Sequence, residues 1–254
     1  MADYLTWQML VLFIAGIWAG GQNALAGGGS FVTLPALMLT GLNPLQANIT
    51  STMALFPAQT LTGYAGRSMV SGIGELSFKA LFIISLIGGV VGAFLLLHTP
   101  SKIFASLVPW LVLFATVVFA WGNFFRKPPR EGEPTHMGKN GMMFTQFCIA
   151  IYGGYFGGGI GFLMLAALTL AGMSTRYAAS TKNVLNAVMN AAAFCVFLLS
   201  PEVSWVRMLI LSAGAIIGGW LGALALKRVN EKALKIAVVC IGIALTIGLF
   251  VKPL

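Results

Sequence analysis

Apolar runs separated by short polar breaks cover almost the whole chain, and their lengths predict helices. Most runs approach the roughly 20 residues that a helix needs to cross a bilayer. Two are shorter, and at about 1.5 Å per residue each reaches only about half of the hydrocarbon core. The predicted segments are Leu5–Ala26, Phe31–Leu42, Ala47–Gly66, Phe78–Leu97, Ile103–Phe125, Met142–Phe156, Phe162–Gly172, Ala178–Leu199, Val206–Leu226 and Ala233–Val251.

This pattern of segments occurs twice. The stretch Gly27–Phe31 recurs 131 positions later as Gly158–Phe162, and at that offset Gly41 pairs with Gly172. We therefore expect two inverted repeats of about five helical segments each, with glycine-broken or short helices near the midplane of the membrane. The expected division is a first transmembrane repeat over 1–125, a cytoplasmic linker over 126–141 and a second transmembrane repeat over 142–254.

The composition is that of a membrane protein. Hydrophobic residues make up 58% of the chain, charged residues make up 8%, and the mean hydropathy is +0.91. A soluble domain of this length would have too little polar surface to face water. The three cysteines lie in apolar runs without CxxC spacing, so they are expected in the core or against lipid. The sequence predicts an all-α polytopic integral membrane protein.

The net charge of +9 indicates topology rather than nucleic-acid binding. With inverted repeats and a cytoplasmic linker, twelve lysines and arginines lie inside or at that edge, and only Lys102, Arg207 and Lys252 lie outside. Four crossings per repeat would instead place eight inside and seven outside. The positive-inside rule favours the first arrangement, so both termini are expected on the non-cytoplasmic face of a bacterial inner membrane.

The glycines divide into two groups. Each glycine cluster, 27–29 and 157–159, lies between a long and a short apolar run, where a helix would break. The break leaves free N–H groups and a positive dipole end, which suit an anion. A role in helix packing remains an alternative for the clusters. Packing is the prediction for the glycines at small-xxx-small spacing, which are Gly16, Gly20, Gly88, Gly92, Gly214, Gly218 and Gly222.

The strongest polar constellation lies in the second repeat. At about 100° per residue, Lys182, Asn186 and Asn190 share one side of a helix with Asn183 beside them. Such a stripe is costly in a membrane unless it faces a cavity or partners, although Lys182 alone would also fit an interfacial position. The equivalent segment of the first repeat, 48–52, is rich in hydroxyl and amide groups.

These motifs resemble the TauE/SafE sulfite exporter family, whose repeats each carry a glycine cluster, a proline-containing apolar stretch, a glycine and an Ala-x-x-Thr-Ser-like segment. The first repeat matches with Gly27–Ser30, Leu34–Leu37, Gly41–Pro44 and Ala47–Ser51. The second departs from the pattern, since Ala166 and Thr175 stand where the first has Pro35 and Pro44. The resemblance covers almost the whole chain. It implies secondary transport of sulfite, thiosulfate or organosulfonates.

From the residues and this resemblance together, we expect alternating access around a midplane site, with export favoured by the membrane potential. Backbone N–H groups, hydroxyls and amides would bind the oxygens of the anion, and Lys182 would balance its charge. The predicted binding residues are Gly28, Gly29, Ser30, Asn48, Thr50, Ser51, Gly159, Gly161, Ser180, Thr181, Lys182, Asn183 and Asn186.

Enzymatic functions are disfavoured. The two histidines lack metal-ligand spacing, no paired carboxylates lie in the apolar runs, and we expect neither a cofactor nor a metal site. A non-transporting membrane scaffold and an uptake permease for another small organic anion remain alternatives. The expected partners are a small-molecule anion and membrane lipid, not nucleic acid, and both a monomer and a homodimer fit the sequence.

Overall fold

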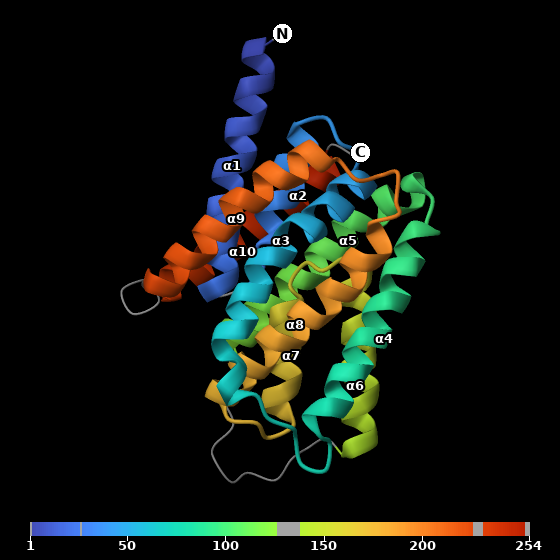
Figure 1. Cartoon of the computed structure of the whole chain (residues 1–254), viewed down its shortest axis with the longest axis vertical. Coiled ribbons are helices and arrows are strands. Elements are labelled where there is room, and N and C mark those ends of the chain that lie inside the picture. The colour runs from blue at the N-terminus through green and yellow to red at the C-terminus, as the bar shows by residue number, and fades with distance from the viewer. Residues whose placement is uncertain (1, 26, 126–137, 226–230, 252–254) are drawn as a thin grey trace.

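Helices account for nearly all of the computed structural model, which describes residues 2–25, 27–125, 138–225 and 231–251 (Figure 1). No β-strand occurs in these ranges. In chain order the elements are α1 (Ala2–Leu25), α2 (Ser30–Leu39), α3 (Pro44–Gly66), the short η1 (Arg67–Met69), α4 (Phe78–Leu97), α5 (Ser101–Ala120), the π-turn η2 (Trp121–Phe125), α6 (Lys139–Tyr155), α7 (Ile160–Leu170), α8 (Thr175–Phe197), α9 (Trp205–Ala225) and α10 (Glu231–Val251).

Three segments among the described residues are long and apolar enough to cross a membrane, namely Phe78–Leu97, Ser101–Ala120 and Trp205–Gly222. Many large apolar side chains on these helices are exposed, as expected where a helix faces lipid. Helices α3 and α8 carry polar side chains along their length, and α2 and α7 are short. The protein is therefore an all-α membrane protein.

Local sequence signals set the starts of several helices. At the start of α3, Asn43 accepts a hydrogen bond from the backbone of Gln46 (2.9 Å), the Gln46 side chain accepts one in return, and Pro44 occupies the first helical position. Ser77 caps α4 by accepting a hydrogen bond from the backbone N–H of Ala80 at 3.2 Å.

Helix α6 begins at Lys139, so the last residues of the predicted linker 126–141 are helical. Apolarity begins later than the helix because Lys139 and Asn140 are polar. Residues 126–137 lie outside the described residues.

Glycines bring two pairs of helices into close contact. In the α1–α9 crossing, a methyl group at Gly20 would clash with the backbone of Ala215. In the α4–α6 crossing, a methyl group at Gly92 would clash with the backbone of Ile151. Similar backbone contacts surround the other glycines at small-xxx-small spacing, so the prediction that they pack helices is confirmed. Substitution of any of them would force helices apart.

The order of helices in α1–α5 is repeated in α6–α10, and their packing partners interchange. Helix α1 packs on α9 and α4 packs on α6, while α3 packs on both α8 and α9 and α8 packs on both α3 and α4. In Figure 1 both termini lie toward one end of the molecule, and α5 ends and α6 begins toward the other. We call the second end the linker face and the first the far face. The crossing of α3 and α8 lies between them.

Candidate functional site

The first glycine cluster breaks the chain between α1 and α2. Gly28 has φ +79°, a left-handed conformation that favours glycine. The Gln22 side-chain amide donates to the carbonyl oxygens of Gly27 and Gly28, at 3.2 and 2.9 Å, and the backbone N–H of Gly29 donates to Asn23 Oδ1 at 2.8 Å. The buried Gln22 side chain and the partly buried Asn23 side chain thus satisfy backbone groups that the break frees.

The second cluster breaks the chain between α6 and α7 in a related way. Gly159, which aligns with Gly28 at the 131-residue offset, has φ +73°. Here the Tyr152 hydroxyl donates to the carbonyl oxygen of Gly158 at 2.9 Å. The N-termini of α2 and α7 therefore both lie in the interior, and neither begins with a side-chain cap from its own N-cap residue.

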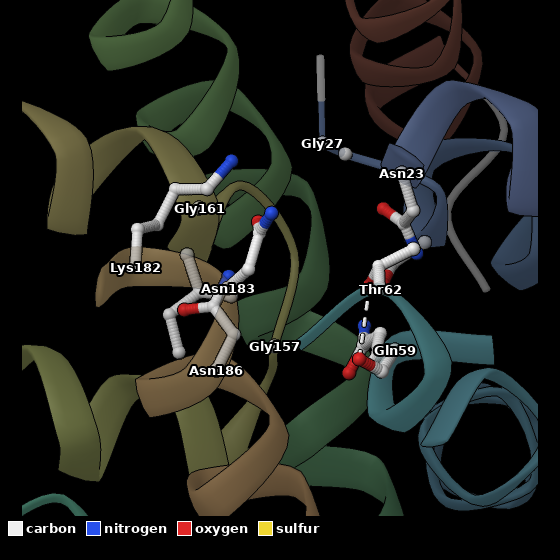
Figure 2. A pocket seen from close by; sticks show the side chains of 12 residues that line it. Asn23, Gly27, Gln59, Thr62, Gly157, Gly161, Lys182, Asn183 and Asn186 are labelled. Atoms are coloured by element: carbon white, nitrogen blue, oxygen red, sulfur yellow. Dashed lines mark hydrogen bonds between the residues drawn. The ribbon is translucent and has the colours of Figure 1, made fainter. Parts of the chain in front are cut away.

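A polar cavity of about 20 Å³ lies between the two breaks (Figure 2). That volume is room for about one water molecule. We call it the central cavity. Its lining residues come from both breaks and from α3 and α8, and are Asn23, Gly27, Gly28, Ser30, Gln59, Thr62, Gly157, Ile160, Gly161, Lys182, Asn183 and Asn186.

Lys182 supplies the charge of the central cavity. Its side chain is only 8% exposed, and among the described residues no carboxylate pairs with its ammonium. Gly161 packs directly against this wall of the cavity, because a methyl group there would lie 3.8 Å from Lys182 Nζ, in ordinary contact, and 3.3 Å from Asn186 Nδ2, which is tight. A buried, unpaired cation in a membrane protein is costly and marks a functional-site candidate.

Amide groups form the rest of the polar surface. Figure 2 shows Lys182, Asn183 and Asn186 on one wall, with Gln59 and Asn23 on the facing wall. Gln59 Oε1 accepts a hydrogen bond from Asn190 Nδ2 just beyond the cavity. Buried amide atoms without a partner gather here, namely Asn23 Nδ2, Asn186 Oδ1 and Asn190 Oδ1. Each such atom costs about 1–3 kcal/mol, which a ligand or water that satisfied it would recover.

The structure brings six of the thirteen predicted binding residues to the central cavity. These are Gly28, Ser30, Gly161, Lys182, Asn183 and Asn186. The other seven lie outside its lining and are Gly29, Asn48, Thr50, Ser51, Gly159, Ser180 and Thr181. Gly29 and Gly159 adjoin the lining as the N-cap residues of α2 and α7, and Ser180 is buried on α8.

Four of the residues outside the lining hold other parts of the protein. Thr50 Oγ1 accepts from the backbone N–H of Ser204 at 3.2 Å, and Thr181 Oγ1 accepts from that of Ser71 at 3.1 Å. The Ser51 hydroxyl lies 2.5 Å from that of Thr33. Asn48 Nδ2 donates to the carbonyl oxygen of Tyr155 at 3.0 Å. These groups join loops and breaks to helices, so each already makes at least one hydrogen bond within the protein.

Six lining residues were not among the predicted set, namely Asn23, Gly27, Gln59, Thr62, Gly157 and Ile160. The internal repeat carried a signal for Gln59, because it aligns with Asn190 at the 131-residue offset and the two are hydrogen-bonded. Asn23 adjoins the first glycine cluster. Thr62 carried no signal. Its hydroxyl donates to the carbonyl oxygen of Gln59 at 2.9 Å.

Within the described ranges, no three His, Cys, Asp or Glu residues lie close enough together to hold a metal ion.

The chain is similar to a known protein family and to several known membrane proteins. The model of the family described as "Sulfite exporter TauE/SafE" matches residues 12–249. A "Probable membrane transporter protein" of Haemophilus influenzae is 31% identical over 85% of this chain and 84% of its own length. "Probable membrane transporter protein ORF9" of a Sinorhizobium species is 30% identical over 100% of this chain and 96% of its own length.

Escherichia coli K12 has a further relative, "Probable membrane transporter protein YfcA", which is 27% identical over 91% of this chain and 85% of its own length. No solved structure matches the chain significantly. The resemblance seen in the motifs is thus confirmed by a match to the family model over nearly the whole sequence. The chain belongs to the sulfite exporter TauE/SafE family of membrane transporters.

Proposed function

We propose that the protein is a secondary transporter, and specifically an exporter, of small sulfur-containing anions such as sulfite, thiosulfate or organosulfonates. The observation that carries this proposal is Lys182, a buried cation that pairs with no carboxylate of the described residues and lies in a cavity between two broken helices. An anion in the central cavity would neutralise the ammonium. Family membership supports the same class of substrate.

The anion would be held by groups from both walls. The ammonium of Lys182 would balance its charge, and the amides of Asn183, Asn186 and Asn23, which line the same cavity, would donate to its oxygens. Helices α2 and α7 begin at Ser30 and Ile160, and both of these residues line the cavity, so the positive ends of two helix dipoles favour an anion there. Such converging donors suit a sulfonate or sulfite group.

Transport requires the cavity to change size. At about 20 Å³ it holds about one water molecule and no sulfonate, so the substrate enters only when the halves move apart. In the proposed mechanism, helices α1–α5 and α6–α10 are inverted repeats that rock about the α3–α8 crossing and expose the cavity to one side at a time. The interchanged packing partners of the two halves support this arrangement.

Topology and direction follow from the charges. Lys182 lies in the central cavity, so eleven lysines and arginines on the linker side remain against three, and this count favours a cytoplasmic linker face with both termini outside in a bacterial inner membrane. In Figure 1 the start of α1 and the end of α10 lie toward the same end of the molecule, which supports placing both on one side of the membrane. An interior-negative potential then favours anion export by roughly 2.3 kcal/mol per charge per 100 mV, without a coupling ion.

The test is ligand-dependent thermal stabilisation of the purified full-length protein, with sulfite, thiosulfate and methanesulfonate as separate probes. A saturating anion at about 100 times its Kd would stabilise the protein by about 2.7 kcal/mol. We expect Lys182→Ala to abolish this stabilisation. The matched control is Lys79→Ala, which removes an exposed lysine of α4 and should leave it unchanged.

Flux into proteoliposomes provides the second readout. Labelled sulfite should cross with the wild-type protein and the Lys79→Ala control but not with Lys182→Ala. A folded wild-type protein that is stabilised by none of the three anions and carries no flux would overturn the proposal. The scaffold alternative would then account better for the buried polar groups.

A further inference from the structure

The central cavity contains a single charge. Of the twelve side chains and glycines that line it, only Lys182 is ionisable, and the others are amides, hydroxyls, glycines and one isoleucine. Lys182 is also more than nine-tenths buried. The ionisable side chains that line the cavity therefore supply one unit of positive charge to balance the charge of a bound ligand.

Other cations near α8 point elsewhere. Arg67, which follows α3, stacks on the ring of Tyr64 at 3.5 Å and donates to the Tyr64 carbonyl oxygen at 3.0 Å, in an exposed position. Lys79 of α4 and Arg176 of α8 are exposed. None of these side chains lines the central cavity, so none is placed to balance a second negative charge there.

The helix ends add partial charges that act only at short range, and together they approach one elementary charge only for a ligand that contacts the first turn of both helices. Each of the α2 and α7 N-termini contributes at most about half an elementary charge, and this attraction falls off within the first turn. The two ends favour any anion. They do not replace a second ammonium or guanidinium for a doubly charged ligand, because an uncompensated charge in a closed, water-poor site is strongly disfavoured.

We propose that the central cavity selects anions by valence, accepting one negative charge and discriminating against two. This rests on the proposed transport of sulfur-containing anions and narrows it, because thiosulfate then leaves the preferred substrates and sulfite is preferred only in its singly charged form. The preferred ligands are monovalent organosulfonates and hydrogensulfite. Sulfate, thiosulfate, fully deprotonated sulfite and carboxylated sulfonates such as sulfoacetate are the disfavoured class, because each leaves one charge without a partner beside Lys182.

Methanesulfonate and sulfate form the critical pair of probes. Both are tetrahedral sulfur oxyanions of similar size, but they carry one and two charges. We expect the purified full-length protein to bind methanesulfonate with a Kd at least tenfold lower than that for sulfate, measured by titration calorimetry at constant ionic strength. Constant ionic strength removes the general screening difference between the two salts.

A second cation should reverse the preference. Asn186→Lys places an ammonium one helical turn after Lys182 on the same wall of the cavity, and Asn183→Lys places one beside it if the first variant does not fold. We expect either variant to lower the Kd for sulfate at least tenfold relative to that for methanesulfonate. Asn140→Lys adds the same charge at an exposed site on α6 and should change neither Kd.

The outcomes separate this inference from the function on which it rests. Equal affinities for sulfate and methanesulfonate in the wild-type protein would overturn valence selection and leave anion transport standing. Absence of binding by either probe, together with absence of sulfite flux, would remove the proposed function itself. A tenfold preference that the added lysine reverses, with the Asn140→Lys control unchanged, would support the inference.

Discussion

The two faces of the molecule are built differently although their elements correspond. At the far face, Arg207 donates to the carbonyl oxygen of Thr40 at 3.0 Å and to Ser204 Oγ at 3.1 Å, which ties the turn after α2 to the start of α9. At the linker face, a hollow of about 300 Å³ separates the loop 71–74 from the turn 171–174. Among the described residues, the Arg207 side chain joins the two segments at the far face, whereas a hollow lies between the corresponding segments at the linker face.

The same contrast continues inside, along the α3–α8 crossing. Toward the far face, the rings of Phe56 and Phe194 lie 5.0 Å apart between centroids. Their equivalents at the 131-residue offset are Ala187 (56 + 131) and Gly63 (194 − 131). A methyl group at Gly63 would lie 3.5 Å from Ala187 Cβ. Two large rings therefore lie on the far-face side of the central cavity along α3 and α8, whereas the equivalent positions toward the linker face hold the smallest residues.

Depth along the helices agrees with this contrast. Lys182 comes seven residues after the start of α8, and Gln59 comes seven residues before the end of α3. At 1.5 Å per residue, both lie about 10 Å from helix ends at the linker face. In terms of the proposed mechanism, this conformation is closed to the far face and has its site nearer the linker face.

The largest effect on this contrast is expected from Phe194→Ala. Loss of the packed ring should cost about 3 kcal/mol of stability and open a path from the cavity to the far face. The measurement uses Asn186→Cys as a reporter after replacement of the three native cysteines, all of which are exposed. An impermeant thiol reagent applied from the far face should label it at least about tenfold faster, which corresponds to about 1.4 kcal/mol.

Position 187 provides the control for that experiment. Ala187→Gly removes the small partner on the linker side, and it should not increase labelling from the far face. Equal labelling rates from the far face with and without the Phe194 ring would show that the aromatic pair is not the barrier.

A smaller effect is expected from Arg207→Ala. The variant loses two hydrogen bonds from a charged donor, so we expect about 1.5–3 kcal/mol of destabilisation and a shift toward conformations open to the far face. Thermal unfolding and the same far-face labelling assay measure these changes. Arg176→Ala removes an exposed arginine at the start of α8 and serves as the control. Identical results for the two variants would contradict a fastening role for Arg207.

The smallest effects are expected from the two equivalent threonines. Thr50→Val and Thr181→Val each remove the acceptor of one loop N–H while preserving side-chain shape, so each should cost about 1 kcal/mol. Melting temperatures of the two variants and of the double variant provide the measurement. A similar fall in melting temperature for the two single variants would show that the hydrogen bond from a loop N–H to a threonine stabilises both faces equally. A fall in Thr50→Val alone would show that the loops of the two faces also differ in stability.

Sequence alone predicted most of the helices because membrane helices consist of long apolar runs, which can be recognised directly in the sequence. The repeated order of segments and the packing glycines could be read directly, since small residues at four-residue spacing allow helices to approach. The start of α6 at Lys139 could not be predicted from the apolar run, because the polar residues that precede the run are also helical.

The candidate site was only partly predictable. The helical period grouped Lys182, Asn183 and Asn186 correctly on one wall. It could not show that the Thr50 and Thr181 hydroxyls accept from loops of the opposite half, because those loops lie more than a hundred residues away in sequence. A polar residue near a helix start suits a ligand and a loop N–H equally well, and only the tertiary structure decides between them.

The two glycine crossings also bear on biogenesis. Each joins a helix of one repeat to a helix of the other, α1 with α9 and α4 with α6. During synthesis at about 5–20 residues per second, α1 waits on the order of ten to forty seconds for its partner. Throughout that time its small-residue face lies against lipid or an insertion factor. A single repeat of this kind would complete both crossings only by pairing with a second copy of itself.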